Sequence, residues 1–310
     1  MSYITVLGSL NMDFVVSVDR LPAPGETVSG RDFQMLPGGK GANQACAAGK
    51  LGAGAVHTRM IGRVGYDVFA DHLKASLAAA GVDAGDVRAT RLQPTGVALI
   101  WVDRSGQNSI VVSPGANHTL SPSDVSGMRT TFRGSRFAMF QLESPLDTVS
   151  AALRQARTEG AETILDPAPA QALSAEMLAD VDILTPNETE ALTLLGLSPS
   201  PVGMADAPEI ARSLRSLGPK RIALKLAEQG CFYFDGEREI VSPGFRVDVK
   251  DTTAAGDTFN GGLAVALAEG LPIEAALRFA NAAAALSVMR VGAQASVPSR
   301  AEVASFLARA

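Results

Sequence analysis

FAMFQLESPLDTVSAALRQARTEGAETIL, residues 137–165, is the stretch that best indicates the fold. It begins with a short apolar run at 137–141, continues with a helical pattern over 146–159, and ends with a second apolar run at 163–165. A strand, a helix of this length and another strand form the unit of which parallel sheets are built. The stretch therefore predicts a parallel sheet with helices packed against it.

The same alternation continues along most of the chain. Further buried strands are expected at residues 4–7, 56–61, 183–185 and 221–226. Further helices are expected at residues 42–51, 69–80, 188–195, 208–217, 256–269 and 273–289. We therefore expect one α/β domain over residues 1–310, with a mostly parallel central sheet and helices on both of its faces. In such sheets, ligands bind beyond the carboxyl ends of the strands.

Two segments depart from this alternation. Residues 13–36 mix apolar residues with turn residues, and residues 95–113 read as a hairpin with strands at 97–102 and 109–112 and a turn at 104–108. Both segments are β-like and lack helical patterns. We expect them to form a small β-sheet that projects over the site as a lid.

Composition limits the class of protein. The 310 residues carry a formal net charge of −5, which argues against a nucleic-acid partner because such proteins normally present a basic face. No apolar run approaches the ~20 residues of a membrane span, and the first residues resemble a strand rather than a signal peptide. Cys46 and Cys231 lack metal-ligand spacing and are expected to be buried in a reducing compartment. We expect a cytoplasmic protein with no nucleic-acid or membrane partner.

DTTAAGDTFNGG, residues 251–262, is the most specific stretch for chemistry. Ala254, Ala255 and Gly256 carry almost no side chain at the start of a helix, so their N–H groups can approach and hold an anion. Asp257 lies in the first turn, where its carboxylate can accept a hydroxyl proton while the anion hole holds a transferring phosphoryl group. The alternative is that Asp257 only caps the helix.

TPNETE, residues 185–190, joins a predicted strand to a predicted helix. Asn187 and Glu190 lie on one face of the first turn, where oxygen ligands suit Mg²⁺ held partly through water. The alternative is a capping box formed by the same two residues. The two interpretations are compatible.

Three further stretches, residues 8–13, 141–145 and 37–43, offer polar groups at predicted strand ends or in a loop. Asp13 can accept hydrogen bonds from two neighbouring sugar hydroxyls, and Glu143 is a second candidate, although each alone is more often a surface carboxylate. The glycines around Lys40 match neither a phosphate-binding P-loop nor a dinucleotide fingerprint. Taken alone, that loop indicates a tight turn before a helix.

Together, residues 8–13, 37–43, 185–190 and 251–257 resemble the ribokinases, within the larger family of carbohydrate kinases that includes fructokinases and adenosine kinase. The resemblance extends from about residue 6 to 298. Several segments are similar to ribokinases in particular; they are residues 24–27, 38–45, 95–99, 166–169 and 292–294.

The resemblance implies transfer of a phosphoryl group from ATP–Mg²⁺ to O5 of D-ribose, giving ribose 5-phosphate, with Asp257 as general base. It implies that the glycine loop grips the sugar and not a nucleotide. The implied sugar-binding residues are Asn11, Met12, Asp13, Gly39, Lys40, Gly41, Ala42, Asn43, Glu143 and Asp257. The implied ATP-binding residues are Asn187, Lys225, Leu226, Ala227, Glu228, Gln229, Gly230, Gly256 and Asn281.

A K⁺ site is also implied by the resemblance, whereas a homodimer through the lid is expected from the apolar face and open edge of the strands at 97–102 and 109–112. The implied K⁺ residues are Asp251, Thr253, Ser287, Arg290, Gly292 and Ser296, mostly through backbone groups that leave no side-chain pattern. One position departs from the family, because ribokinases usually carry glycine where this chain has Ala227. If that position adopts a positive φ, alanine is strained there by about 1 kcal/mol or more.

Three other functions stay open at this point. A kinase for 2-deoxyribose or another pentose would use the same machinery, and Asp13 discriminates between these sugars only weakly. A nucleoside kinase would need an aromatic platform for a base, which the sugar loop does not offer. A sugar-binding regulator without catalysis would have no use for Asp257 and its anion hole.

Overall fold

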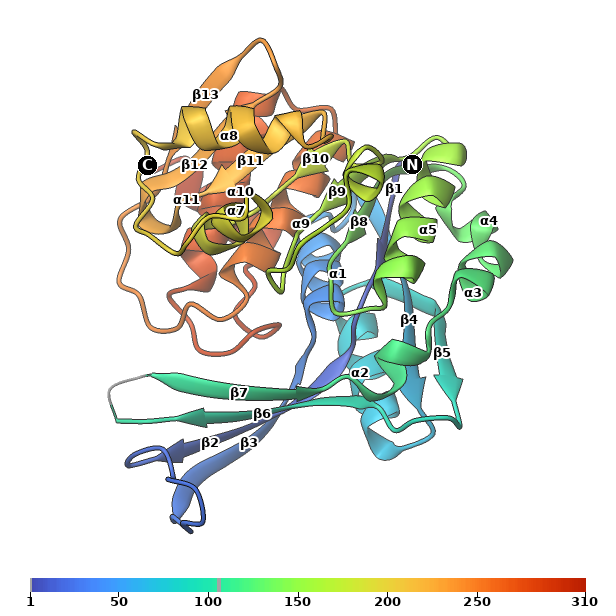
Figure 1. Ribbon diagram of the computed structural model, residues 1–310, viewed down its shortest axis with the longest axis vertical. Coiled ribbons are helices and arrows are strands. Elements are labelled where there is room, and N and C mark those ends of the chain that lie inside the picture. The colour runs from blue at the N-terminus through green and yellow to red at the C-terminus, as the bar shows by residue number, and fades with distance from the viewer. Residues whose placement is uncertain (1, 105–106) are drawn as a thin grey trace.

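The computed structural model describes residues 2–104 and 107–310 and arranges most of them around a nine-stranded sheet (Figure 1). In spatial order its strands are β13 (Glu239–Pro243), β12 (Gly230–Phe234), β11 (Arg221–Lys225), β10 (Ile183–Leu184), β9 (Glu162–Leu165), β8 (Ser135–Phe140), β1 (Ser2–Leu7), β4 (Val56–Gly65) and β5 (Val82–Thr90). Neighbouring strands from β11 to β5 are parallel, and β12 and β13 are antiparallel. The predicted α/β class with a mostly parallel sheet is confirmed.

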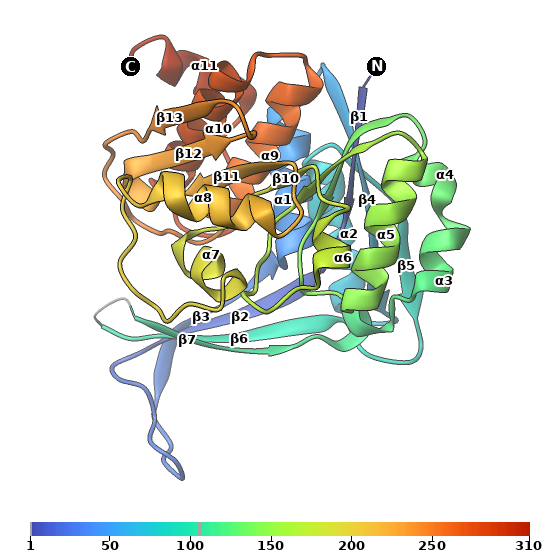
Figure 2. The same ribbon diagram turned by 45° about the horizontal axis from the view of Figure 1, so that its top comes forward.

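Helices cover both faces of this sheet (Figures 1 and 2). One face carries α1 (Lys40–Leu51), α2 (Val68–Ala79), α9 (Ala255–Ala268), α10 (Ile273–Ser287) and α11 (Arg300–Leu307). The other carries α3 (Pro122–Gly127), α4 (Arg129–Phe132), α5 (Leu146–Thr158), α6 (Ala175–Leu178), α7 (Glu188–Leu194) and α8 (Ala207–Ser216). Along β8, Phe137 and Met139 join the first core and Ala138 and Phe140 the second, because successive strand side chains point to opposite faces.

The strands that the sequence pattern does not predict lie at the sheet edges. β5 is half exposed and contains Asp83, Asp86 and Arg88, so it has no continuous apolar run. β12 and β13 form an antiparallel pair at the opposite edge. Short 3₁₀ turns at η1 (Gly115–Thr119) and η2 (Ala227–Gln229) are likewise too short to leave a periodic pattern.

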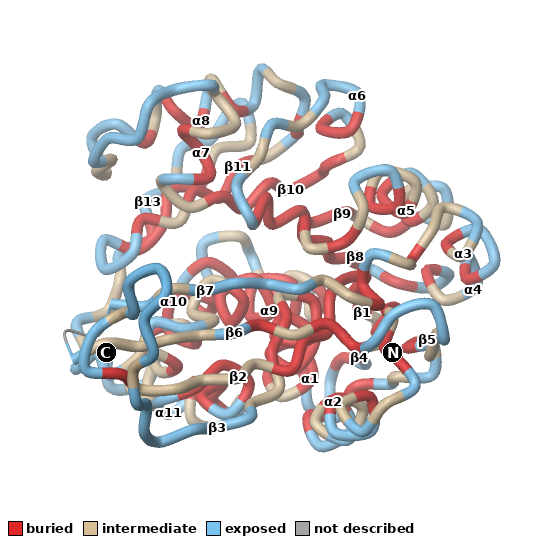
Figure 3. The backbone as a smooth tube through the Cα atoms, turned by 60° about the horizontal axis from the view of Figure 1, so that its bottom comes forward, coloured by how far each residue is buried: buried red, intermediate tan, exposed pale blue. Residues whose placement is uncertain are grey.

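The predicted small sheet is present as a separate unit with strand order β3–β2–β6–β7. Its strands are β2 (Asn11–Val18), β3 (Gly30–Gly38), β6 (Gly96–Val102) and β7 (Asn108–Ser113). Residues 105 and 106, in the expected turn of the hairpin, lie outside the described residues. Figures 1 and 2 show this sheet projecting from the main body, and Figure 3 shows that much of β3 and β7 is exposed.

Across residues 2–104 and 107–310, none of the helices combines the length and the apolar character needed to cross a bilayer. Cys46 and Cys231 are both buried and both free, as expected for residues that pack as small hydrophobes.

Candidate active site

The carboxyl ends of five neighbouring strands, β11, β10, β9, β8 and β1, supply most of the candidate site. Lys225 ends β11, Asn187 follows β10 and Asp166 directly follows β9. Glu143 and Asn11 follow β8 and β1. Because these strands are parallel, their carboxyl ends together form one edge of the sheet, which runs across the strands. This is where α/β proteins bind ligands. The topology therefore gathers residues from distant parts of the sequence.

A cavity of about 310 Å³ lies at this edge. It is lined by Lys40, Asp166, Ala168, Asn187, Glu188, Glu190, Lys225, Ala227, Thr252, Ala254, Ala255, Gly256 and Asp257. The cavity thus joins three of the predicted motifs: the glycine loop through Lys40, the segment after β10, and the start of α9.

The N–H of Ala255 donates to the carbonyl of Thr252 at 3.2 Å. An anion hole is expected at this start of α9. Its N-cap is Ala254, in the left-handed region with φ 58° and ψ 19°. The first N–H groups of a helix have no carbonyl partner within the helix and carry its positive dipole end. A Cβ on Gly256 would lie 3.3 Å from Nζ of Lys225, so glycine leaves open space beside that ammonium group.

Asp257 faces α1 and does not cap its own helix. Its Oδ2 accepts a hydrogen bond from Nδ2 of Asn43 at 3.1 Å, and its Oδ1 accepts one from Nε2 of Gln44 at 3.0 Å. Burial, reinforced by the charge of Asp166, raises the pKa of Asp257 to about 6, although Lys40 and the two amides oppose the rise. A carboxylate with this pKa, beside a cavity, is suited to general base catalysis near neutral pH.

The glycine loop owes its composition to a close approach of two backbone segments. Gly39 has φ 88°, and a Cβ there would lie 2.8 Å from the backbone nitrogen of Asn11. A Cβ on Gly41 would lie 2.5 Å from the carbonyl carbon of Gly8. The tight turn expected from the glycines is confirmed, and it places the start of α1 directly against the turn after β1.

Glu143 and Asp13, two of the expected sugar-binding residues, both lie next to the glycine loop. Oε2 of Glu143 accepts hydrogen bonds from Oγ of Ser9 at 2.5 Å and from the backbone N–H of Lys40 at 3.1 Å. Burial, and next the negative charge of Glu143, raise the pKa of Asp13 to about 7. Asn11 is buried, and its Oδ1 accepts a hydrogen bond from Asn117. Of the expected sugar residues, only Lys40 and Asp257 line the 310 Å³ cavity.

Asn187 and Glu190 form the predicted capping box of α7. The backbone N–H and Nδ2 of Asn187 donate to the two carboxylate oxygens of Glu190, at 2.8 and 2.9 Å. Both residues also line the cavity, so capping does not remove them from the site. In the described part of the chain, no three His, Cys, Asp or Glu side chains cluster as a metal cage. This donor set fits Mg²⁺ that is held by one carboxylate, by water and by substrate phosphates.

The segment after β11 contains the expected departure from the family. Ala227 has φ 47°, so the residue that replaces glycine does occupy the left-handed region. Leu226 is fully buried, its backbone N–H donates to the carbonyl of Gly230 at 2.8 Å, and its carbonyl accepts from the N–H of Gln229 at 2.9 Å. Asn281 is also buried and donates to the carbonyl of Ser242 at 2.9 Å; it does not line the cavity.

The segments expected to bind K⁺ lie side by side. Oδ2 of Asp251 accepts from the N–H of Gly292 at 2.8 Å, and its Oδ1 accepts from the N–H of Thr253 at 2.9 Å. The hydroxyl of Ser296 donates to the carbonyl of Ala293. The loop before α9 is thereby tied to the loop after α10.

Two buried residues of this site are absent from the sequence-based candidates. Asp166 pairs with Lys225, with Oδ1 2.8 Å from Nζ, and Gln44 bridges Asp166 and Asp257. The signal for Asp166 was a carboxylate directly after a predicted strand, at the edge where ligands bind. Gln44 had no comparable signal, because an amide inside a helix is ordinary.

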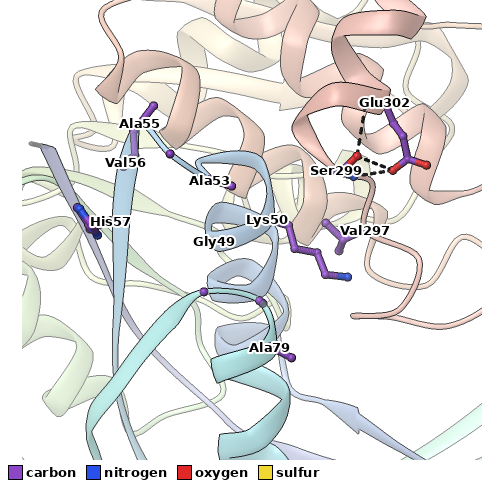
Figure 4. A pocket seen from close by; sticks show the side chains of 13 residues that line it. Gly49, Lys50, Ala53, Ala55, Val56, His57, Ala79, Val297, Ser299 and Glu302 are labelled. Atoms are coloured by element: carbon purple, nitrogen blue, oxygen red, sulfur yellow. Dashed lines mark hydrogen bonds between the residues drawn. The ribbon is translucent and has the colours of Figure 1, made fainter.

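A second cavity, of about 690 Å³, lies elsewhere, near the carboxyl ends of α1 and α2 (Figure 4). Lys50 and Ala79 line it together with Val297, Ser299 and Glu302. Glu302 is engaged with Ser299, as Figure 4 shows, and with Arg290. None of the expected catalytic or binding residues lines this cavity, so the smaller one is the candidate active site.

Comparisons with known proteins find relatives along nearly the whole chain. Residues 1–300 match the family described as "pfkB family carbohydrate kinase". The chain is 42% identical over 310 residues to the ribokinase of Haemophilus influenzae, covering 99% of each chain, and 35% identical over 306 residues to the deoxyribokinase of Salmonella typhi, covering 98% of each. Its fold is similar, with a TM-score of 0.89 and 35% identity over 99% of each chain, to Arabidopsis thaliana ribokinase complexed with ribose and ATP.

Proposed function

Because the chain belongs to the pfkB family of carbohydrate kinases and is an ATP-dependent sugar kinase, we propose that it phosphorylates D-ribose at O5 to give ribose 5-phosphate. The mechanism rests on the lining of one cavity. Asp257, Lys40 and the start of α9 line it together with Asn187 and Lys225. An acceptor hydroxyl placed there lies between a base and an anion hole.

Asp257 accepts the proton of the ribose 5-hydroxyl as the hydroxyl oxygen bonds to the γ-phosphorus of ATP. The bond from that phosphorus to the bridging oxygen of ADP breaks, and ADP leaves with the electron pair. The N–H groups at the start of α9 and the ammonium of Lys225 face the charge that spreads over the transferring phosphoryl oxygens. Ala254, Ala255 and Gly256 form the anion hole in this proposal.

The sugar lies between the glycine loop and the turn after β1. Asp13 accepts hydrogen bonds from two neighbouring hydroxyls, and Asn11, Asn43, Lys40 and Glu143 surround the remaining ones. The backbone of Gly39 passes under the ring, where the absence of a Cβ permits close contact. The small sheet acts as a lid that excludes water from the sugar. The contacts around Ser9 and Glu143 support this placement, because they fix the loop against the turn.

ATP lies along Asn187, the segment from Lys225 to Gly230 and the region of Asn281. Mg²⁺, when bound, would neutralise charge on the phosphates, and Glu190 would hold it through water. K⁺ would lie between the loops that Asp251 joins, held with backbone groups of Thr253, Ser287, Arg290 and Gly292 and with Ser296 nearby. A cation at that point would order the loop that leads into α9.

A kinase for 2-deoxyribose is the second candidate, favoured by the 35% identity to a deoxyribokinase. Ribose and 2-deoxyribose differ at the 2-hydroxyl, which is one of the two sugar hydroxyls assigned to Asp13. If Asp13 binds two hydroxyls, a sugar that lacks one of them leaves a buried acceptor unpaired, at a cost of ~1–3 kcal/mol.

The test is ADP release from ATP and Mg²⁺ with a panel of pentoses and nucleosides, scored by kcat/KM. We expect ribose to exceed 2-deoxyribose by about tenfold or more. Equal values for the two sugars would contradict the choice of ribose in favour of a broader pentose kinase. ADP release with a nucleoside and not with ribose would contradict the proposed acceptor. Sugar binding without any ADP release would indicate a regulator.

A further inference from the structure

Two buried carboxylates in the site share one amide group as their hydrogen-bond donor. Nε2 of Gln44 lies 3.0 Å from Oδ1 of Asp257 and 2.9 Å from Oδ2 of Asp166. The three residues are only 1%, 6% and 3% exposed, so water does not supply these hydrogen bonds. An amide NH₂ group has two hydrogens, and Gln44 uses both to link two negative charges.

The orientation of this amide is held by a second glutamine. Nε2 of Gln141 donates to Oε1 of Gln44 at 2.6 Å. If the Gln44 amide were turned over, its oxygen would face both carboxylates and repel them. Gly8 leaves room for this arrangement, since a Cβ there would lie 2.1 Å from Oε1 of Gln141. Gly8, Gln44 and Gln141 therefore pack together as one unit.

The other side of Asp166 leads to the anion hole. Oδ1 of Asp166 is 2.8 Å from Nζ of Lys225, and that ammonium group borders Gly256 at the start of α9. A continuous chain of contacts thus runs from Asp257 through Gln44 and Asp166 to Lys225. It connects the group beside the acceptor hydroxyl with the cation beside the transferring phosphoryl group.

We propose that Gln44 is a positioning residue, which holds the carboxylate of Asp257 toward the acceptor hydroxyl and fixes its place relative to the Asp166–Lys225 ion pair. This inference rests on the proposed role of Asp257 as general base. A residue that only filled space at this position would not need two donors aimed at two carboxylates.

Gln44 also helps to set the charge state of the base. The charged groups that face Asp257 are Lys40 from α1, Asp166 after β9 and Lys225 from β11, with the amides of Asn43 and Gln44 completing its surroundings. A donor to a carboxylate favours the ionised form. Without the Gln44 donor, Asp257 therefore holds its proton to a higher pH, and the fraction of active enzyme at mildly acidic pH falls.

The test is Gln44→Met, which keeps the length of the side chain and removes both donors. We expect kcat near pH 6 to fall by about tenfold or more, with a smaller loss at alkaline pH. The acid limb of the kcat profile should move up by about one pH unit, and KM for the sugar should change less than kcat. The matched control is Gln155→Met, whose amide donates to Glu159 just after the end of α5 and which should alter neither quantity.

A lower melting temperature with an unmoved pH profile and wild-type kcat would overturn the inference, because it would leave Gln44 with a purely structural role. Asp257→Asn, measured in parallel, separates the two proposals. If Asp257→Asn retains wild-type kcat, the general base and this inference both fail. If it loses activity while Gln44→Met does not, only this inference fails. Should Gln44→Met not fold, Gln141→Met replaces it, with a shift in the same direction expected and an unmoved profile again overturning the inference.

Discussion

Asp257 is held between opposing influences on its pKa. Burial and the nearby charge of Asp166 raise the pKa, whereas Lys40 and the amides of Asn43 and Gln44 lower it, and the balance is a pKa of about 6. Below that pH the carboxyl group keeps its proton and cannot accept another from the sugar. Above it, the group is an ionised carboxylate that is only 6% exposed.

Replacing Asp257 by Asn should lower kcat by at least about 100-fold, since a positioned general base typically contributes ~10²–10⁴ in rate. In the wild-type enzyme, kcat should fall as the pH drops through about 6, because Asp257 then becomes protonated. Both effects are measured by ADP release over a range of pH.

Stability provides the control for Asp257→Asn. A carboxyl group whose pKa is raised on folding contributes stability below its unfolded pKa, and this contribution is lost as the pH rises through about 6. At pH 8 the Asn variant should therefore melt at or above the wild-type temperature. The mechanism would be contradicted if Asp257→Asn keeps more than about a tenth of the wild-type kcat. It would also lose its support if unfolding of the variant explained the loss of activity.

The residues that sequence patterns identify are those with a distinctive local setting. Asp257 lies in a helix start made of small residues, and Asn187 lies in a capping box, so the neighbouring residues alone predict both as candidates. Gln44 donates to Asp166, and Asp166 pairs with Lys225. These contacts join α1, the residue after β9 and the end of β11. Only the folded sheet edge brings them together, which is why local patterns do not indicate the pair.

At the scale of whole elements, buried strands are predicted from their local sequence, whereas edge strands depend on contacts with other parts of the chain. β8 and β11 are buried on both faces and read as apolar runs, so they are predicted from sequence. β5 and β13 are partly exposed edge strands with polar residues, and their identity depends on the neighbour that each one pairs with. The ends of the seven expected helices agree with the structure to within two residues, because capping residues and glycines mark many of them, whereas the shorter helices α3, α4, α6 and α11 are not predicted.

The loops that flank α9 and α10 lead to a prediction about monovalent cations. Asp251 joins the two loops through hydrogen bonds to Thr253 and Gly292. Since the first loop continues into the start of α9, an ion held by carbonyls of both loops should order the proposed anion hole. Replacing K⁺ by Li⁺ at constant ionic strength should lower the rate of ADP release, because Li⁺ is too small for a site built of several backbone carbonyls.

Asp251→Asn is the matched variant for this experiment. It keeps the shape of the side chain but removes its charge, so the difference between K⁺ and Li⁺ should shrink. An identical rate in both salts for the wild-type enzyme would contradict the proposed cation site.

At the scale of the whole molecule, the small sheet has exposed apolar side chains that nothing in the single chain covers. Ile110, Val111 and Val112 of β7 are about half exposed, and so is Leu99 of β6. Adjacent strand residues point to opposite faces, so β7 presents apolar side chains on both of them. Within the described chain, β7 pairs only with β6, which leaves its other edge open. Open apolar edge strands tend to pair with another chain.

We therefore predict that two copies of the chain associate through the small sheet. Light scattering at micromolar concentration, with ribose present, should give the mass of a dimer. Ile110→Lys should shift the protein toward the monomer, because it would place a charge in an apolar contact. Val241→Lys is the matched control: Val241 is 52% exposed, as is Ile110, but it lies on β13 at the far edge of the large sheet. A monomeric wild-type protein, or equal effects of the two lysines, would show that the small sheet is not the contact.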